Sequence, residues 1–145
     1  MAVYNKFQDF SEQLMRGVHD WDAHTFKIAL TNTSPVNTQI SLDTVTNHPA
    51  PAAASGYTAG GTAATISISE SAGTTTVQGT QVVFTAAGGS IGPFRYAILY
   101  NDTATSPADA LVGWWDYGSS ITLADTETFT VQFNSTSPGT ILTLA

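Results

Sequence analysis

The stretch that decides the fold is Ala110–Phe133, which reads ALVGWWDYGSSITLADTETFTVQF. Its last part, ETFTVQF, alternates apolar and polar residues with a period of two, which is typical of a half-buried β-strand. Its first part carries two adjacent tryptophans and is also rich in residues that favour strands. Gly118 and Asp125 mark bends between the two parts. The stretch therefore predicts two strands joined by a turn.

The adjacent tryptophans, Trp114 and Trp115, raise the question of whether this stretch is a binding platform or a part of the core. Successive side chains of a strand point to opposite faces, so the two rings cannot form one flat surface for a sugar. We expect one ring in the core and the other against a neighbouring strand, the helix or another subunit. Trp115 is the candidate for a partner or subunit contact.

The same alternation continues along most of the chain on both sides of this stretch. The alternating runs are separated by Gly, Pro, Asn and Asp, which are turn signals. The run PFRYAILYND is apolar on both faces, which predicts a central strand. About eight short antiparallel strands, in a sandwich or a barrel, are therefore expected over residues 24–145. The other runs are TFKIALTN, TAATISISES, GTQVVFTAAGG and GTILTLA.

The first twenty residues follow a different period. Tyr4, Phe7, Phe10 and Leu14 recur at spacings of three and four, which is the repeat of one face of a helix. Polar residues fill the opposite side, so the pattern predicts one amphipathic helix over residues 1–20. A chain of 145 residues has the size of one domain. We assign a single domain, 1–145, in which this helix precedes the β-structure.

Composition argues against several classes of partner. Four basic residues face eleven acidic ones, for a net charge of −7. A nucleic-acid partner is not expected, because a phosphate track needs clustered Lys and Arg. A membrane partner is not expected either, because no stretch approaches the roughly 20 apolar residues of a transmembrane helix and no signal-peptide pattern is present. The absence of cysteine excludes disulfides and thiolate metal sites.

No pattern of catalytic or metal-binding residues stands out. His19, His24 and His48 lack the spacing of metal ligands. Asp125 and Glu127 are two carboxylates close in sequence, but LADTET is better interpreted as a turn than as a glycosidase pair. We therefore expect no catalytic residue, no metal and no cofactor.

Arg95 is the basic residue with the most informative surroundings, because it stands within the mostly apolar run GPFRYAILY. Two interpretations remain open for it. It forms a structural ion pair with an acid such as Asp116, or it anchors a subunit contact.

Five blocks of the chain resemble a family of small proteins encoded among the virion structural genes of tailed bacteriophages. The resemblance covers nearly the whole chain and is most specific over Gly92–Asp102 and Leu111–Phe133. It implies a jelly-roll β-sandwich, which needs eight antiparallel strands. The blocks are NKFQDFSEQLMRGVHDW, FKIALTNTSPVNTQ, GYTAGGTAATI, GGSIGPFRYAILYNDTA and LVGWWDYGSSITLADTETFTVQF.

The resemblance implies a capsid decoration, or cement, protein that is not an enzyme. Such a protein is made in the cytoplasm of the host bacterium. It binds the outside of the shell formed by the major capsid protein, commonly as a homotrimer, and becomes part of the virion. The apolar stripe Tyr4, Phe7, Phe10 and Leu14 is then the candidate adhesive element. Alternatively, the helix that carries it covers an open end or face of its own sandwich.

Two other functions remain as alternatives. The chain is a tail, neck or fibre module that binds other virion proteins or host glycans, in which case the aromatic run WWDYG is the feature to probe. Otherwise it is a glycan hydrolase of the cell envelope. A hydrolase needs two opposed carboxylates lining a cleft, and Asp116, Asp125 and Glu127 are the candidates.

Overall fold

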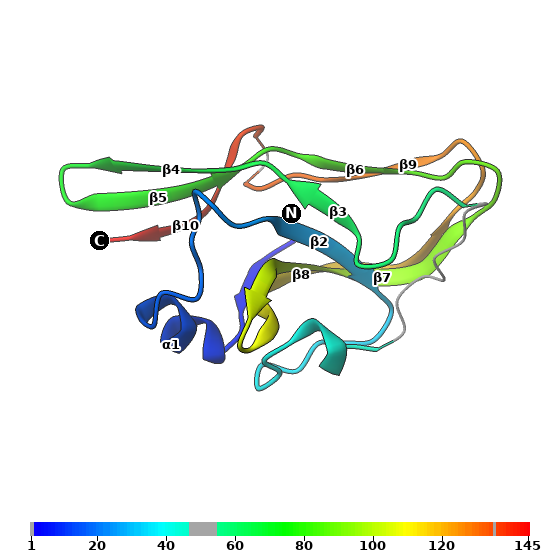
Figure 1. Ribbon diagram of the computed structural model, residues 1–145. Coiled ribbons are helices and arrows are strands. Elements are labelled where there is room, and N and C mark those ends of the chain that lie inside the picture. Colours follow the sequence, from blue (N-terminus) through cyan, green and yellow to red (C-terminus); the bar gives the residue numbers. More distant parts are fainter. Residues whose placement is uncertain (1, 47–54, 135) are drawn as a thin grey trace.

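The computed structural model describes residues 2–46, 55–134 and 136–145. These residues form antiparallel β-sheets with one short α-helix, which confirms the all-β prediction. Figure 1 shows the elements, and their bounds are β1 (Tyr4–Lys6), α1 (Asp9–Met15), β2 (Phe26–Thr31), the 3-10 helix η1 (Leu42–Thr44), β3 (Thr62–Ala64), β4 (Ile66–Ser71), β5 (Thr74–Gly79), β6 (Val82–Thr85), β7 (Ile91–Thr105), β8 (Ala108–Leu123), β9 (Thr128–Val131) and β10 (Gly139–Leu144).

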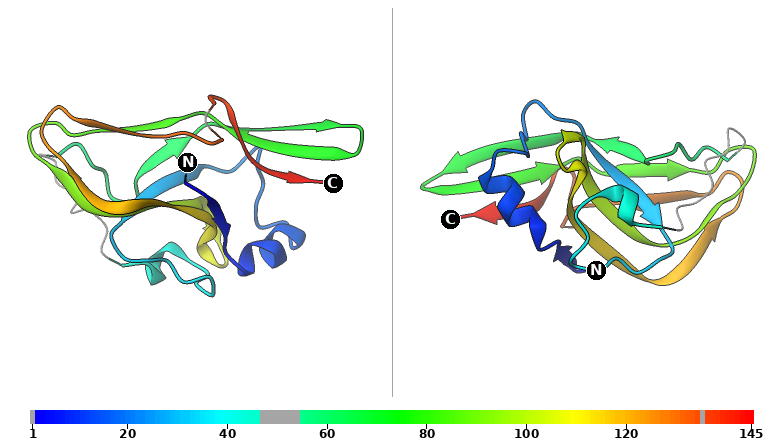
Figure 2. Two further views of the ribbon diagram at one scale, coloured as in Figure 1. Left: turned by 180° about the vertical axis from the view of Figure 1, so that it is seen from behind. Right: turned by 60° about the horizontal axis from the view of Figure 1, so that its bottom comes forward.

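The strands form two layers. One layer is a five-stranded sheet in the order β1-β8-β7-β2-β3. The other consists of the sheet β10-β5-β4 and the pair β6-β9, which lie above the first layer in Figure 1 and are seen from behind in Figure 2. The described residues contain ten strands rather than about eight. The difference arises because the run TAATISISES is divided into β3 and β4, because β5 carries too few large apolar residues to be recognised, and because β1 lies within the range predicted to be a helix.

The centre of the five-stranded sheet is the long hairpin of β7 and β8. Both strands run well beyond the usual five to six residues of a strand. β7 is buried on both faces, as its apolar run predicts, because each face of the sheet covers a different cluster. The N-terminal strand β1 attaches to this hairpin through β8, whereas the C-terminal strand β10 pairs with β5 of the other layer.

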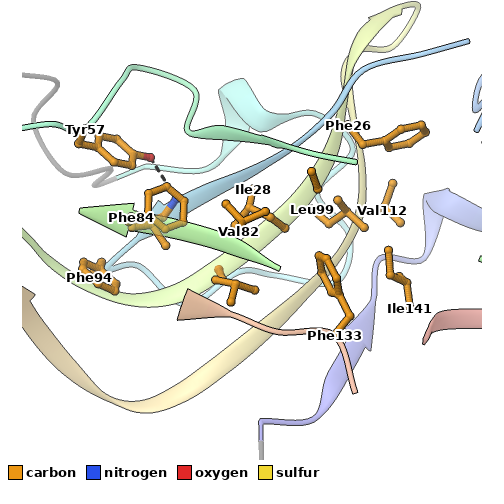
Figure 3. Close-up of a cluster of buried hydrophobic side chains, with 14 of the residues drawn as sticks. Phe26, Ile28, Tyr57, Val82, Phe84, Phe94, Leu99, Val112, Phe133 and Ile141 are labelled. Atoms are coloured by element: carbon orange, nitrogen blue, oxygen red, sulfur yellow. Dashed lines mark hydrogen bonds between the residues drawn. The ribbon is translucent and has the colours of Figure 1, made fainter. Parts of the chain in front are cut away.

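The larger cluster lies between the two layers (Figure 3). It joins Leu99 and Val112 of the five-stranded sheet to Val82 and Phe84 of the other layer. Tyr57 closes one side of the cluster, and its hydroxyl accepts a hydrogen bond of 3.1 Å from the backbone N–H of Leu30. Burial of each large side chain contributes about 1.5–3 kcal/mol, so this cluster is the main source of stability.

A smaller cluster lies on the opposite face of the five-stranded sheet. There Ile98, Tyr100 and Leu111 are covered by Phe7 and by Leu42 of η1. The two tryptophans of β8 divide between the clusters. Trp114 packs against the smaller one and Trp115 against the larger one. This separation of the rings agrees with the alternation expected of a strand.

The N-terminal helix is shorter than the predicted range of residues 1–20. Only Asp9–Met15 is helical, and Tyr4–Lys6 is instead an edge strand paired antiparallel with residues 113–115 of β8. Tyr4 pairs with Trp115, so cross-strand contacts determine the conformation there rather than the local period. The helix ends before Gly17, whose φ of +75° is incompatible with an α-helix.

Candidate functional site

A groove of about 700 Å³ lies along one side of the molecule, between the edges of the two layers. Its lining includes Tyr4 of β1, Arg95 of β7 and Trp115 of β8 on the side of the five-stranded sheet. Residues of β9 and β10 line the side of the other layer. The groove is therefore lined by the terminal strands β1 and β10 and by β8 and β9, which belong to the stretch Ala110–Phe133.

The rims of the groove are strand edges. In the described part of the chain, β1 and β10 are the outermost strands of their sheets, and β9 is paired with β6 alone. An outermost strand has backbone N–H and C=O groups on one side that no neighbouring strand uses. Such an edge can accept a strand from another polypeptide. The rims thus offer backbone pairing as well as side-chain contacts.

Aromatic rings form part of the apolar lining of the groove, together with aliphatic side chains of β9 and β10. The ring centroid of Trp115 lies 5.3 Å from that of Tyr4 and 5.4 Å from that of Phe133, which is buried behind the lining. Tyr117 and Phe129 form a second pair, in edge-to-face geometry at 5.5 Å. These distances are typical of favourable aromatic pairs. Trp115 and Phe129 are partly buried, whereas Tyr117 is exposed to solvent.

Tyr4 is held in place by a small residue of the neighbouring strand, Gly113. A Cβ at Gly113 would lie 2.2 Å from the Tyr4 ring, so the ring occupies space that only a glycine leaves. Burial raises the pKa of the Tyr4 phenol well above its ordinary value. The hydroxyl is buried and has no hydrogen-bond partner among the described residues. Tyr4 therefore belongs to the wall of the groove as a neutral, mainly apolar surface.

Arg95 forms a bidentate ion pair with Asp116 of the neighbouring strand. Its Nε and Nη2 atoms donate to the two carboxylate oxygens at 2.8 Å each. The backbone N–H of Gly118 also donates to Asp116, at 2.8 Å. The hydrogen bond from Arg95 holds the pKa of Asp116 below its usual value. Asp116 is thus the acidic partner that the sequence suggested for Arg95. The ion pair fixes the partly exposed guanidinium of Arg95 at the groove.

The six candidate contact residues divide into two groups. Tyr4, Arg95 and Trp115 come together at the groove. Phe7 and Phe10 are buried in the smaller and the larger cluster, and Leu14 packs partly against the larger one. Phe7 and Phe10 therefore pack within their own domain. Their burial agrees with the alternative in which the N-terminal segment covers its own sandwich. The reason is that β1 and α1 dock on β8 instead of forming one free helix.

A second polar cluster, which the sequence analysis missed, surrounds Asn101 of β7. The Asn101 side chain is fully buried, and its amide group donates to the Val18 carbonyl at 3.1 Å and to His24 Nδ1 at 2.9 Å. The same amide lies 3.3 Å from His19 Nδ1. Its oxygen accepts backbone N–H groups of two following residues. No spacing rule connects His19 with Asn101, because 82 positions separate them.

The buried His19 makes stability depend on pH. Burial, with a smaller contribution from His24, lowers the His19 pKa from 6.5 to about 4. The folded state thus binds this proton less readily than the unfolded state, so stability is complete above about pH 6.5 and falls as the pH decreases toward 4. Between pH 7 and pH 5 we expect a loss of at most about 2 kcal/mol, measured as the free energy of unfolding in urea.

The control for this prediction is His19→Gln, which keeps a polar side chain but cannot titrate. It is expected to be less stable at pH 7 and to show a smaller change in free energy between pH 7 and pH 5. An unchanged pH dependence in His19→Gln would assign the effect to another group.

The carboxylates considered for a hydrolase lie in other surroundings. Asp125 accepts the backbone N–H of Gly88 at 2.7 Å, and Glu127 accepts that of Ala124 at 2.7 Å. Both side chains are exposed; Glu127 stabilises the turn before β9, and Asp125 connects this turn to the loop after β6. Asp116 is engaged by Arg95. Each of the three carboxylates therefore has a structural partner.

Metal-binding clusters, membrane-spanning helices and similar proteins assign no function to the chain. Among residues 2–46, 55–134 and 136–145, no group of three His, Cys, Asp or Glu side chains could hold a metal ion, and His48 lies outside these ranges. No helix in the same ranges is long and apolar enough to cross a membrane. Comparison with protein-family models, with curated proteins and with solved structures found no match for the chain.

Proposed function

We propose that this chain is a bacteriophage capsid decoration protein that binds the outside of the shell formed by the major capsid protein and stabilises the head. The observation that carries the proposal is the groove, where three of the residues named from the sequence meet between unpaired strand edges. An aromatic groove with strand edges at its rims is suited to holding a segment of another protein. The resemblance to virion proteins is the ground on which we propose the major capsid protein as that partner.

The proposal includes a jelly-roll type of sandwich and a homotrimeric assembly. Three copies on one rigid trimer hold a shell more tightly than one copy, because linked contacts raise avidity by about 10²–10⁴. A weak contact at each groove is then sufficient for stable decoration. A protein with this role needs no catalytic residue and no cofactor, and its place is the outer surface of the virion.

A tail, neck or fibre module that binds host glycans is the second candidate. The observation that favours it is Tyr117, whose side chain is 54% exposed at the groove. Exposed aromatic rings are a common stacking surface for the apolar faces of ligands. The two candidates differ in partner but use the same groove, so one set of variants tests both.

The test is co-sedimentation with undecorated capsids of the phage that encodes the chain. Wild-type protein is expected to bind in a fixed ratio to the major capsid protein. Tyr117→Ser removes an exposed ring from the groove and is expected to weaken binding about tenfold or more, which corresponds to about 1.4 kcal/mol. Thermal unfolding checks that the variant remains folded.

The matched control is Val36→Ser, because Val36 is 56% exposed but does not line the groove. It is expected to bind like wild type. Absence of stoichiometric binding by the wild-type protein would contradict the decoration function. Loss of cell adhesion or glycan binding in Tyr117→Ser, with capsid assembly intact, would favour the tail or fibre alternative.

A further inference from the structure

Residues 9–24 form a segment that is fixed to the sandwich at both of its ends, and we call this segment the flap. It contains α1 and the connection from α1 to β2 (Figure 1). Just before the flap, the backbone N–H of Gln8 donates to the Asn37 carbonyl at 3.0 Å. Just after it, the backbone of Thr25 bonds to two residues of β7. The flap can therefore move only as a loop between two fixed points.

The hydrogen bonds between the middle of the flap and the sandwich converge on one side chain, Asn101 of β7. Its amide nitrogen lies 3.1 Å from the Val18 carbonyl. The same nitrogen lies 3.3 and 2.9 Å from the Nδ1 atoms of His19 and His24. All other hydrogen bonds that the structure describes for residues 12–24 stay within the flap. A single amide group thus fastens the flap to the sheet.

The orientation of this amide group is fixed from its other side. The Asn101 oxygen accepts the backbone N–H groups of Thr103 and Ala104 at 3.1 and 3.2 Å. If the group turned by 180°, its NH₂ would point at these two donors and leave them without an acceptor, which is costly for buried groups. The NH₂ must therefore face the two histidines. Because it only donates, the Nδ1 atom of each ring has to be free of a proton.

A protonated histidine does not fit this arrangement. An imidazolium carries an N–H on both ring nitrogens, so its Nδ1–H would meet the NH₂ of Asn101. The other nitrogen of His19, Nε2, is buried and has no hydrogen-bond partner among the described residues. A charged His19 ring would therefore leave two buried donors without an acceptor. Movement of the flap away from Asn101 relieves both conflicts, because it brings the ring into water.

The groups that face His19 do not compensate a positive charge. They are Phe10 of α1, Phe26 of β2, Asn101 of β7 and, within the flap, Trp21 and His24. His24 is the one titratable group among them, and its charge opposes protonation of His19. Three aromatic rings and one neutral amide form the rest of the surroundings. The pocket around His19 is therefore suited to a neutral ring.

Carboxylates of the neighbouring elements have other partners. Asp20 in the flap accepts the backbone N–H groups of two following residues at 3.0 Å each. Glu12 of α1 is in an exposed ion pair. Asp102 of β7 pairs with Lys27 of β2, and Asp109 of β8 interacts with both of them. Asp102 follows Asn101 directly, so its side chain points to the opposite face of the sheet.

We propose that Asn101, His19 and His24 form an acid-sensitive latch, and that protonation of the histidines releases the flap while the sandwich stays folded. At neutral pH the flap is also held by apolar contacts, above all by Trp21, whose ring stacks on Phe26 at 4.3 Å. Release uncovers this aromatic pair. The strand pairing of the sheet does not depend on the flap, because β2 is paired with β3 and β7.

The direction and size of the acid effect follow from proton linkage. The His19 pKa is 6.5 in an open flap and about 4 in the closed one. The closed form thus binds the proton less readily, so opening becomes more favourable as the pH falls below 6.5, and the gain levels off below about 4. From His19 alone, the equilibrium constant for opening is expected to rise about twentyfold between pH 7 and pH 5.

The latch is separate from the function proposed for the groove. Among the described residues that line the groove, none belongs to the flap. The inference therefore goes beyond the proposed function and does not rest on it. Its test uses the full chain without capsids, so the two proposals can fail independently.

Hydrogen exchange at pH 7 and pH 5 tests the latch. A helix of seven residues is not stable by itself, so a released flap loses its internal hydrogen bonds. The N–H groups of Val18 and His24, each bonded within the flap at 2.9 Å, therefore report the opening. After correction for the slower chemical exchange at pH 5, we expect the opening constant at these two amides to rise about twentyfold.

Low concentrations of urea distinguish release of the flap from unfolding of the whole domain. Opening of the flap exposes little surface, so exchange at Val18 and His24 is expected to be nearly independent of urea. Exchange of the amides of β2 is expected to accelerate with urea, because it requires global unfolding. If the flap amides followed urea as steeply as those of β2, the flap would open only when the domain unfolds, and the inference would be wrong.

His19→Gln and His24→Gln remove the titrating groups, and Glu12→Gln is the matched control. We expect the acid response to be largely lost in His19→Gln and absent in the double variant. Glu12→Gln removes a carboxylate from the same segment and is expected to respond like wild type. An unchanged acid response in the double variant, or no response in the wild type, would overturn the latch.

A titration of the wild-type protein by NMR does not depend on whether the variants fold. The His19 imidazole is expected to take up its proton below pH 5, in a more acidic range than a free histidine. Titration of His19 near pH 6.5, with the flap amides still protected, would show that the closed flap accommodates the cation and would also overturn the inference.

Discussion

Replacing Gly61 by alanine is expected to destabilise the protein by more than about 3 kcal/mol, enough to unfold much of a marginally stable domain. An added Cβ would lie 1.8 Å from the carbonyl oxygen of Ile28 and 2.8 Å from the Cα of Ala29. These atoms belong to the backbone of β2, which pairs with both β3 and β7. The backbone there cannot move aside without losing hydrogen bonds on both edges of β2.

Gly73→Ala separates this steric effect from the cost of the backbone angle. Gly61 and Gly73 have nearly equal φ angles, +83° and +84°, but an added Cβ at Gly73 meets no atom within 4 Å. Its expected cost is therefore only the conformational one, about 1–2 kcal/mol. Urea unfolding of the two variants measures the difference. Equal losses would show that the contact with β2 is not the cause.

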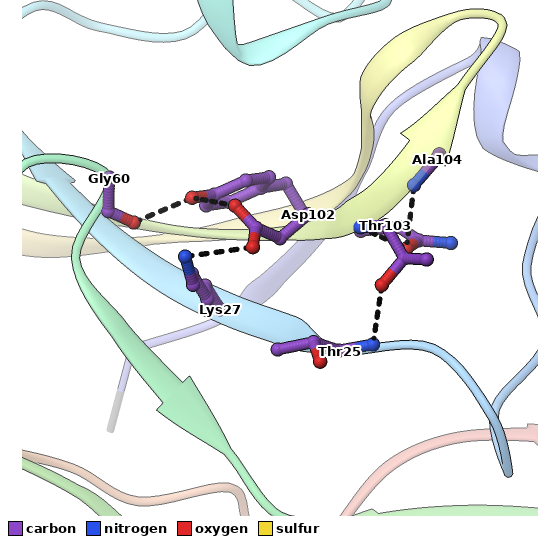
Figure 4. A network of polar contacts seen from close by, with 8 residues as sticks. Thr25, Lys27, Gly60, Asp102, Thr103 and Ala104 are labelled. Atoms are coloured by element: carbon purple, nitrogen blue, oxygen red, sulfur yellow. Dashed lines mark hydrogen bonds and ion pairs between the residues drawn. The ribbon is translucent and has the colours of Figure 1, made fainter.

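The segment before Gly61 is anchored in a way that prevents relaxation. The Tyr100 hydroxyl donates to the Gly60 carbonyl at 2.7 Å (Figure 4). In the same network, Lys27 forms an ion pair of 2.8 Å with Asp102. The loop therefore cannot lift away from β2 without also breaking the hydrogen bond from Tyr100. This constraint supports a large effect for Gly61→Ala.

Removal of the Asn101 side chain is expected to cost about 3 kcal/mol, because it leaves several buried polar groups without a partner. The amide oxygen accepts N–H groups of Thr103 and Ala104 at 3.1 and 3.2 Å, and the amide nitrogen bonds the segment that contains His19 and His24. Asn101→Ala would therefore loosen the connection from α1 to β2. We expect a lower urea midpoint and loss of the His19 contribution to the pH dependence.

Thr103→Val is the comparison for this variant. It removes only the hydroxyl that accepts the Thr25 N–H at 2.9 Å, near the solvent (Figure 4). Its expected cost is about 1 kcal/mol or less. If Asn101→Ala lost no more stability than Thr103→Val, the Asn101 network would not be a significant part of the fold.

The class of fold could be predicted because side-chain alternation records which face of a strand is buried. β9 shows this directly, with Phe129 and Val131 facing the interior as its pattern predicts. The N-terminal segment shows the limit of the method. Tyr4 matches a helical period, but its pairing with Trp115 and its contact with Gly113 place it in a strand. A contact between positions more than a hundred residues apart leaves no local period.

Residues of the candidate site could be predicted individually, but their assembly into one groove could not. Arg95 stood out as a rare cation in an apolar run, and Trp115 as one of two adjacent aromatic rings. That they meet Tyr4 in one groove depends on the pairing of β1 with β8 and on where β9 and β10 end beside them. The Asn101 cluster was not predictable, because a buried asparagine has no sequence signature until its partners are known.

By itself, the sequence determined most of the strands, the central position of β7 and the separation of the two tryptophans. These properties depend on neighbours within a few residues, where strand geometry alone sets the direction of each side chain. The tertiary structure decided the short helix, the burial of Phe7 and Phe10, the groove and the projecting hairpin of β4 and β5. These features depend on which distant segments pack together, and packing is settled by the shape and volume of the whole core.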